Sequence, residues 1–116
     1  MYTDIRLRII DCKDKDLSHI GIGPGLVELL EEIEVCKSVT KASEKMGMSI
    51  SKCWRIIKSA EKNRGRKLTQ SISGGTDGGQ TLLTDYAKTI VRIFRQIEEE
   101  TYKTANRELE KFCDQF

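Results

Sequence analysis

Hydrophobic and polar residues alternate at the start of the chain and then fall into helical repeats. Ile5, Leu7 and Ile9 are separated by single polar residues, which is the pattern of a β-strand. The polar run at 12–16 predicts a turn, and residues 17–22 can return as a second short strand. We therefore expect an N-terminal β-hairpin.

A helix is predicted after Gly23. Pro24 suits the first helical position, where its missing N–H costs no hydrogen bond. The apolar residues that follow recur at helical spacing, and they are Leu26, Leu29, Leu30 and Ile33. The intervening positions are mostly glutamates and are expected to face solvent. An acidic helix of this kind should lie away from a polyanion.

Residues 38–67 contain two amphipathic segments separated by a turn. Ser38 and Ser49 are good caps for the helices that begin after them, and Gly47 suits a left-handed helix end. The second helix, at about 49–63, has an inner stripe made of Ile50, Cys53, Trp54, Ile57 and Ala60. This arrangement predicts a helix-turn-helix, whose second helix can enter the major groove of DNA.

The outer face of the predicted second helix consists of hydrogen-bond donors without an acid. Such a face matches phosphates and the acceptor atoms of guanine. Arg55 and Lys52 are the best candidates for base edges, and the other residues are expected mainly at the DNA backbone. The full predicted DNA-binding set is Lys41, Ser49, Ser51, Lys52, Arg55, Lys58, Lys62, Arg64, Arg66 and Lys67.

The charge of the chain is divided unevenly. The formal net charge is +2, but residues 38–67 hold nine lysines or arginines against two glutamates, a net charge of +7. The remaining residues hold eleven basic groups against sixteen acidic ones, a net charge of −5. Positive charge gathered on the predicted helix-turn-helix favours a polyanionic partner, although a solvated basic face is the alternative reading of charge alone.

Two short strands follow, at 68–72 and 80–83, and the glycine-rich loop 73–79 joins them. A hairpin in this position predicts a winged helix. The loop has no Gly-Lys-Ser/Thr sequence and no dinucleotide fingerprint, so we do not expect it to bind a nucleotide. It carries Asp77 and no basic residue, so its contribution to DNA affinity is expected to be small.

The last segment, from Asp85 to about Cys113, is predicted to be a long helix capped by Thr84. A long helix with a heptad-like apolar stripe in a small protein is typical of a dimerisation element. The alternative is a helix that folds back at 98–101 onto its own domain. The residues predicted to form the dimer contact are Ala87, Ile90, Phe94, Ile97, Leu109 and Phe112.

The chain offers little for catalysis or for a metal. Its four cysteines form no Cys-x-x-Cys pair and it has one histidine, His19, so we expect neither a metal site nor a disulfide framework. Cys53 lies on the inner stripe and is expected to be buried and inert. No signal peptide or membrane span is evident. We expect a cytoplasmic protein without cofactor, and not an enzyme.

Several segments resemble the ModE-type molybdate-responsive regulators. Residues 23–33 resemble the family's Gly-Pro-Gly-x-x-x-Leu-Leu-x-x-Ile opening, and residues 37–49 its Gly-Ser-Ile-x-x-Ala-Ala-x-x-Leu-Gly-Met-Ser segment. Trp54 falls on the family's recognition-helix tryptophan, and residues 73–79 resemble its glycine-rich wing. The helix-turn-helix is also similar to that of LysR-type regulators. The resemblance covers about residues 20–97, and it implies the fold and DNA binding.

The departures from the family pattern concern the DNA-facing residues. Ile50 and Ser51 replace an aromatic and basic pair, Cys53 replaces an alanine, and Leu82 replaces a basic residue. The family's operator therefore cannot be transferred. Full ModE-type regulators also have a C-terminal molybdate-binding region, whereas this chain stops after the long helix. The resemblance therefore does not imply an oxyanion site in this chain, and whether molybdate is an effector is left open.

Together these patterns predict a mainly α fold with small β elements. We expect a winged helix-turn-helix at 1–83 with an N-terminal hairpin, and a long C-terminal dimerisation helix at 84–116 within the same structural domain. The predicted function is a dimeric, sequence-specific transcriptional regulator that binds double-stranded DNA. The alternative is a protein-interaction module on a winged-helix scaffold. An effector or partner protein is left unidentified.

Overall fold

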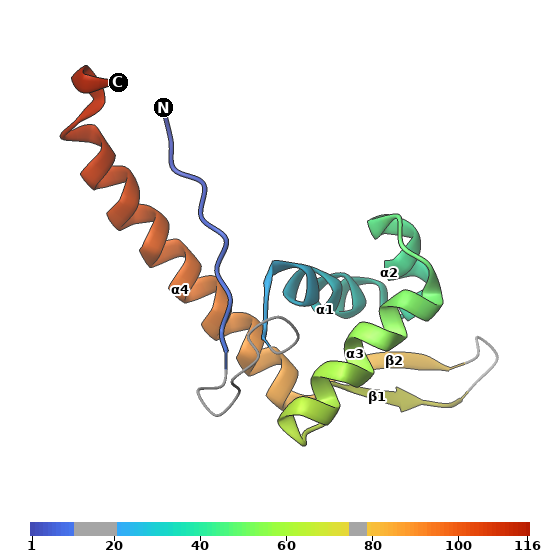
Figure 1. The fold of residues 1–116 in the computed structure, drawn as a ribbon. Coiled ribbons are helices and arrows are strands. Elements are labelled where there is room, and N and C mark those ends of the chain that lie inside the picture. Colours follow the sequence, from blue (N-terminus) through green and yellow to red (C-terminus); the bar gives the residue numbers. More distant parts are fainter. Residues whose placement is uncertain (11–20, 75–78) are drawn as a thin grey trace.

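The computed structural model describes residues 1–10, 21–74 and 79–116, and it is mainly helical with a small sheet (Figure 1). This confirms the predicted mainly α fold. The helices and strands, in chain order, are α1 (Pro24–Cys36), α2 (Val39–Met46), α3 (Ile50–Arg64), β1 (Thr69–Ile72), β2 (Gln80–Leu83), α4 (Asp85–Glu110) and the short 3-10 helix η1 (Cys113–Gln115).

The ends of α2 and α3 are fixed by the caps that the sequence predicts. The Ser38 hydroxyl accepts the Lys41 N–H at 3.2 Å, and the Ser49 hydroxyl accepts the Lys52 N–H at 3.1 Å. Gly47, which ends α2, has a φ of 65° in the left-handed region that favours glycine. The turn between the two helices of the helix-turn-helix is therefore set by local hydrogen bonds and one glycine.

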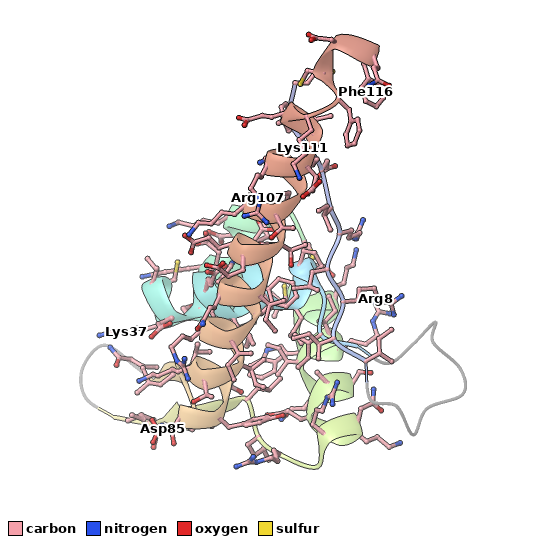
Figure 2. The ribbon with its side chains drawn as sticks, turned by 90° about the vertical axis from the view of Figure 1, so that its left-hand side faces the viewer. Arg8, Lys37, Asp85, Arg107, Lys111 and Phe116 are labelled. Atoms are coloured by element: carbon pink, nitrogen blue, oxygen red, sulfur yellow. The ribbon has the colours of Figure 1, made fainter. Side chains whose placement is uncertain are left out.

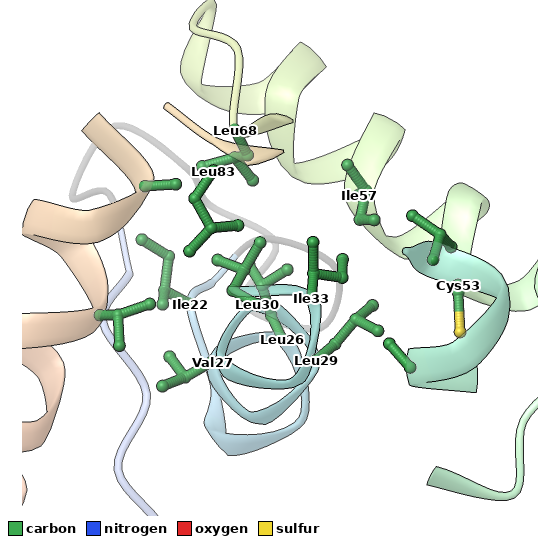
Figure 3. Packing of buried hydrophobic residues seen from close by; sticks show 14 of the residues in the cluster. Ile22, Leu26, Val27, Leu29, Leu30, Ile33, Cys53, Ile57, Leu68 and Leu83 are labelled. Atoms are coloured by element: carbon green, nitrogen blue, oxygen red, sulfur yellow. The ribbon is translucent and has the colours of Figure 1, made fainter. Parts of the chain in front are cut away.

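Helix α1 lies in the middle of the hydrophobic core (Figure 3). Its buried residues point toward α3 and the sheet on one side and toward α4 on the other, and they are Leu26, Val27, Leu29, Leu30 and Ile33. The surrounding elements contribute Cys53, Ile57, Leu68, Leu83, Ala87 and Phe94. Because α1 is shared by all these neighbours, its burial fixes how the helix-turn-helix sits relative to α4.

The wing is a two-stranded antiparallel sheet in which Thr69 pairs with Leu83 and Ile72 with Gln80. It is joined to α4 through Thr84, whose hydroxyl donates to the Lys67 carbonyl at 2.8 Å and accepts the Ala87 N–H at 3.2 Å. The same side chain therefore closes the base of the wing and caps the next helix. Residues 75–78, which include Asp77, lie outside the described residues.

The N-terminal segment lies against α4 (Figure 1). The Tyr102 hydroxyl donates to the Ile5 carbonyl at 2.8 Å, and the Thr3 N–H donates to Asn106 Oδ1 at 2.8 Å. The predicted alternation is present, because Ile5, Leu7 and Ile9 are half-buried whereas Asp4, Arg6 and Arg8 are exposed. For the described residues 1–8, however, the neighbour is a helix rather than a strand.

The predicted hairpin is represented by one antiparallel bridge, between Ile9 and Ile22. The predicted turn at 12–16 and most of the second strand fall within residues 11–20, which lie outside the described part of the chain. The hairpin therefore stays a prediction.

Helix α4 is continuous over 26 residues and does not fold back at 98–101. Its first half is attached to α1 through Arg95, whose guanidinium lies 2.6 Å from Glu31 and 2.7 Å from Glu98. The hydrogen bond that Arg95 donates to Glu31 is the main reason why the pKa of Arg95 is raised. Glu31 was expected to be solvated, so the pairing corrects that expectation. The second half of α4 projects beyond α1, with the N-terminal segment alongside (Figure 2).

The fold predicts a large effect of truncating Phe94, which is fully buried and attaches α4 to the core. Phe94→Ala should lower the free energy of unfolding by about 3–5 kcal/mol, because a large buried side chain is replaced by a cavity. Urea unfolding followed by circular dichroism measures this. Tyr2→Ala, at an aromatic residue that is 83% exposed, is the control and should change stability by less than about 0.5 kcal/mol.

Candidate nucleic-acid interface

One face of α3 is buried against the rest of the chain. Cys53 and Ile57 are fully buried, as predicted, and Trp54 and Ala60 are half-buried against the core. Burial raises the pKa of the Cys53 thiol, although nearby Lys52 opposes the shift. The thiol is therefore protonated and enclosed, which confirms the expectation that Cys53 is a core residue.

Ile50 departs from the predicted inner stripe, because its side chain is 44% exposed. The helical spacing that places Ile50 in line with Ile57 is correct. Ile50 is, however, the first residue of α3, and the side chains of this helix are buried only from Cys53 onward. Its assignment to the core is wrong.

The buried face of α3 continues through a carboxylate that the sequence analysis did not select. Glu61 is 6% exposed, and its Oε2 accepts the backbone N–H groups of Leu68 at 2.8 Å and Thr69 at 3.4 Å. Its Oε1 lies 3.3 Å from the ammonium of Lys58. Glu61 therefore attaches α3 to the first residues of the wing. The sequence does contain a signal for this burial, because Glu61 lies four residues after Ile57 and therefore on the same face of the helix.

The pKa of Glu61 is the result of opposing effects. Burial raises it, but the two backbone N–H donors and Lys58 together lower it below the ordinary value. The side chain is therefore held as a carboxylate. Because Lys58 remains 58% exposed, it can contribute to this contact and still present its charge to solvent.

The opposite face of α3 is exposed and made of donors. Ser51, Lys52, Arg55, Lys58 and Lys62 are all exposed along the length of the helix. The Lys58 ammonium also lies 5.5 Å from the Trp54 ring centroid, a cation–π contact along one side of this face. The structure thus places these five predicted residues on one surface, which we call the donor face.

A hollow of about 280 Å³ lies where α3 turns into β1. Its lining is Lys58, Glu61, Lys62, Gly65, Arg66 and Lys67. Glu61 pairs with Lys58, but four basic residues against one carboxylate leave the hollow positively charged. The Arg66 guanidinium lies 4.2 Å from the Tyr86 ring centroid, which holds it at the edge. The hollow has the charge and size to receive a phosphate group.

The remaining predicted DNA-binding residues have different surroundings. Lys41 is exposed on α2, and the Ser49 hydroxyl accepts the helix-capping hydrogen bond described above. Arg64 is half-buried, and its Nη2 donates to the Ile9 carbonyl at 3.3 Å. Arg64 is thus directed toward the N-terminal segment rather than the donor face, and its contact with the DNA backbone stays a prediction.

The residues predicted to form the dimer contact differ in how far they are buried. Ala87 and Phe94 are fully buried in the core of the chain itself, and Ile90 packs against that core. The side chains of Ala87 and Phe94 are therefore not accessible to a second copy, and their assignment to a dimer contact is corrected, whereas Ile90 is half-buried. Ile97 and Phe112 are exposed and Leu109 is half-buried.

Within the described ranges, no three side chains from Cys, His, Asp and Glu gather in a way that could hold a metal ion. In those ranges, none of the helices is long and apolar enough to cross a bilayer.

Curated relatives match about two thirds of the chain. The chain is 32% identical to the transcriptional regulator ModE of Haemophilus influenzae over 77 residues, or 66% of this chain. It is 32% identical to the molybdenum transport protein ModE of Azotobacter vinelandii over 81 residues, or 70% of this chain. The chain is similar to ModE-type regulators.

The ModE resemblance predicted from the sequence is thus confirmed for about two thirds of the chain. The molybdenum transport protein ModE of Herbaspirillum seropedicae matches at 26% identity over 80 residues. In each case the matched part spans 30% of the ModE relative's own length. No protein-family model matches the chain.

The attachment of α3 to the wing predicts a pH-dependent effect of Glu61→Gln. The substitution should lower the free energy of unfolding by about 1–3 kcal/mol at neutral pH, because the charged acceptor of two buried N–H groups is lost. The folded-state pKa of Glu61 is lowered, so its contribution is present above the ordinary value of 4.5 and disappears as the pH falls through the folded-state value.

Urea unfolding of both proteins in a series of buffers from about pH 7 down to about pH 2 measures this difference. Glu34→Gln, at an exposed glutamate of α1, is the matched control and should be neutral throughout. A Glu61→Gln effect that is the same size at both ends of the series contradicts the assignment.

Proposed function

We propose that the protein is a transcriptional regulator that binds double-stranded DNA with α3 in the major groove. The donor face is the observation that carries the proposal. The similarity to a transcriptional regulator over two thirds of the chain supports it. It is proposed as a non-enzymatic protein whose partner is DNA.

The donor face suits this role because every side chain on it can donate a hydrogen bond. Arg55 lies near the middle of α3, is exposed, and can reach base edges, where arginine pairs with guanine O6 and N7. The hollow at the end of α3 suits a backbone phosphate. Arg55 would thus contact bases, and the residues around the hollow would contact the DNA backbone. Phosphate contacts place the helix, and base contacts supply specificity.

Removing the Arg55 guanidinium should relax specificity at one base pair. Arg55→Ala is expected to cost about 1–3 kcal/mol of binding free energy on the preferred duplex and much less on unrelated duplexes. Selection of bound sequences from a random duplex pool identifies the preferred site, and fluorescence anisotropy measures affinity. Arg92→Ala, which removes an exposed arginine from α4, is the matched control. Equal preference in Arg55→Ala and the parent protein contradicts the role of Arg55.

Binding should also weaken steeply with salt. If six to ten phosphates are contacted, affinity should fall by about 10³–10⁵-fold between 50 and 200 mM salt. The variant Lys62→Ala should reduce the slope of log affinity against log salt by about one. Failure to bind any duplex at low salt contradicts the proposed function as a whole.

We further propose that the protein acts as a dimer through the projecting half of α4. At 26 residues α4 is about 39 Å long, and its distal part extends beyond the core (Figures 1 and 2). Ile93 and Ile97 are 37% and 41% exposed on one side of it. Next to them lies an open hollow of about 550 Å³ lined by Gln96, Ile97, Glu100, Thr101, Thr104 and Ala105. Two copies would also suit paired half-sites on DNA.

The dimer proposal predicts that Ile97→Ser weakens self-association. The substitution removes an apolar contact from the exposed side of α4, so sedimentation equilibrium should show a shift toward monomer at equal concentration. Lys88→Ser places the same residue on the opposite side of the helix, nine positions before Ile97, and should leave association unchanged. A parent protein that is monomeric at high micromolar concentration contradicts the proposal.

A second candidate function is a protein-interaction module on the same scaffold. It is favoured by the wing, whose strands β1 and β2 contain neither lysine nor arginine. A wing without cations adds little to DNA affinity. The duplex-binding measurements above separate the two, because an interaction module shows no salt-dependent DNA binding.

A further inference from the structure

Ile50 is the exposed apolar residue at the start of α3, and the function proposed above does not use it. Its side chain is 44% exposed, whereas Met48 and Trp54 near it are half-buried against the core. The residues on both sides of it, Ser49 and Ser51, are exposed and polar. An isolated exposed isoleucine is ordinary on a protein surface, so exposure alone does not assign a role to Ile50. Its position on the helix does.

That position is the first turn of the proposed recognition helix. When a helix-turn-helix binds DNA, the N-terminal residues of the second helix contact base edges. Ile50 is the first residue of α3, after the Ser49 cap. It also begins the row Ile50, Trp54 and Lys58, spaced four residues apart, which borders the donor face. A helix inserted by its donor face therefore carries Ile50 into the groove.

The chemistry of the major groove restricts what Ile50 can contact favourably. Base edges there present hydrogen-bond donors and acceptors, and the apolar group among them is the 5-methyl of thymine. An isoleucine side chain cannot satisfy a donor or an acceptor, and covering one with it costs free energy. Contact with a thymine methyl instead removes apolar surface from water on both partners.

We propose that Ile50 is a specificity-determining residue that reads the 5-methyl group of one thymine in each half-site. This inference rests on the proposed DNA-binding function and adds a base preference to it. Arg55 and Ile50 then have separate tasks. Arg55 recognises acceptor atoms, and Ile50, which lies five residues closer to the start of α3, recognises an apolar group.

Deoxyuridine provides the direct test, because it differs from thymidine only by the missing methyl group. The preferred duplex is first recovered from a random pool with the full chain. Each thymine is then replaced singly by deoxyuridine, and affinity is measured for the parent protein, Ile50→Ala and Val35→Ala. Val35 is a branched residue of α1 that is 73% exposed, so it controls for loss of an exposed aliphatic side chain.

The proposal expects one thymine per half-site at which deoxyuridine weakens binding of the parent protein and of Val35→Ala by about fourfold. At that position Ile50→Ala should bind thymine and deoxyuridine equally. If no thymine is sensitive, or if the sensitive one stays sensitive in Ile50→Ala, the assignment of Ile50 is overturned while DNA binding stands. If no duplex is bound at all, the proposed function fails, and the role of Ile50 fails with it.

Discussion

The burial of one face of α3 is the constraint on which the rest of the interface depends. Cys53 and Ile57 are enclosed by the core, and Glu61 continues the same face with a carboxylate that accepts two backbone N–H groups from the start of β1. Once this face is fixed, the opposite face has to point outward, and every side chain that lies there is a donor. The orientation of the helix and the position of the wing therefore follow from one set of contacts.

The same constraint explains how charge is distributed. The buried carboxylate of Glu61 accepts two backbone N–H groups and pairs with Lys58, so it offsets one of the four basic residues around the hollow at the end of α3 and leaves an excess of positive charge. Two acids of α1 pair with neighbouring helices, Glu31 with Arg95 of α4 and Glu32 with Lys45 of α2. Positive charge thus stays on the side of the molecule that α3 presents, and negative charge helps to hold the helices together.

Much of the fold could be predicted from the sequence because local rules fix it. Ser38, Ser49 and Thr84 cap helices and Gly47 ends one, and each acts through hydrogen bonds or backbone angles within a few residues. The donor face follows from helical periodicity. The wing strands follow from their flanking glycines and apolar residues, and their bounds agree with the prediction closely.

The errors arose where long-range packing decides the outcome. The alternation at 1–10 is the same for a strand in a sheet and for a segment lying on a helix, so periodicity could not identify α4 as its neighbour. Ile50 has core spacing, but the covering surface ends before it. Phe94 and Ile97 share one apolar stripe, and only the position of α1 determines which is enclosed. Glu61 was missed because a charge on a buried stripe depends on backbone donors from another segment.

The central claim, that α3 is the DNA-contacting surface, is tested most directly by mapping amide chemical-shift changes in the isotope-labelled protein as duplex is added. The account predicts that the largest changes occur along α3 from Ile50 to Lys62 and around Arg66 and Lys67, and that they diminish with salt. Changes confined to α1 or the distal half of α4, with α3 unaffected, would contradict it.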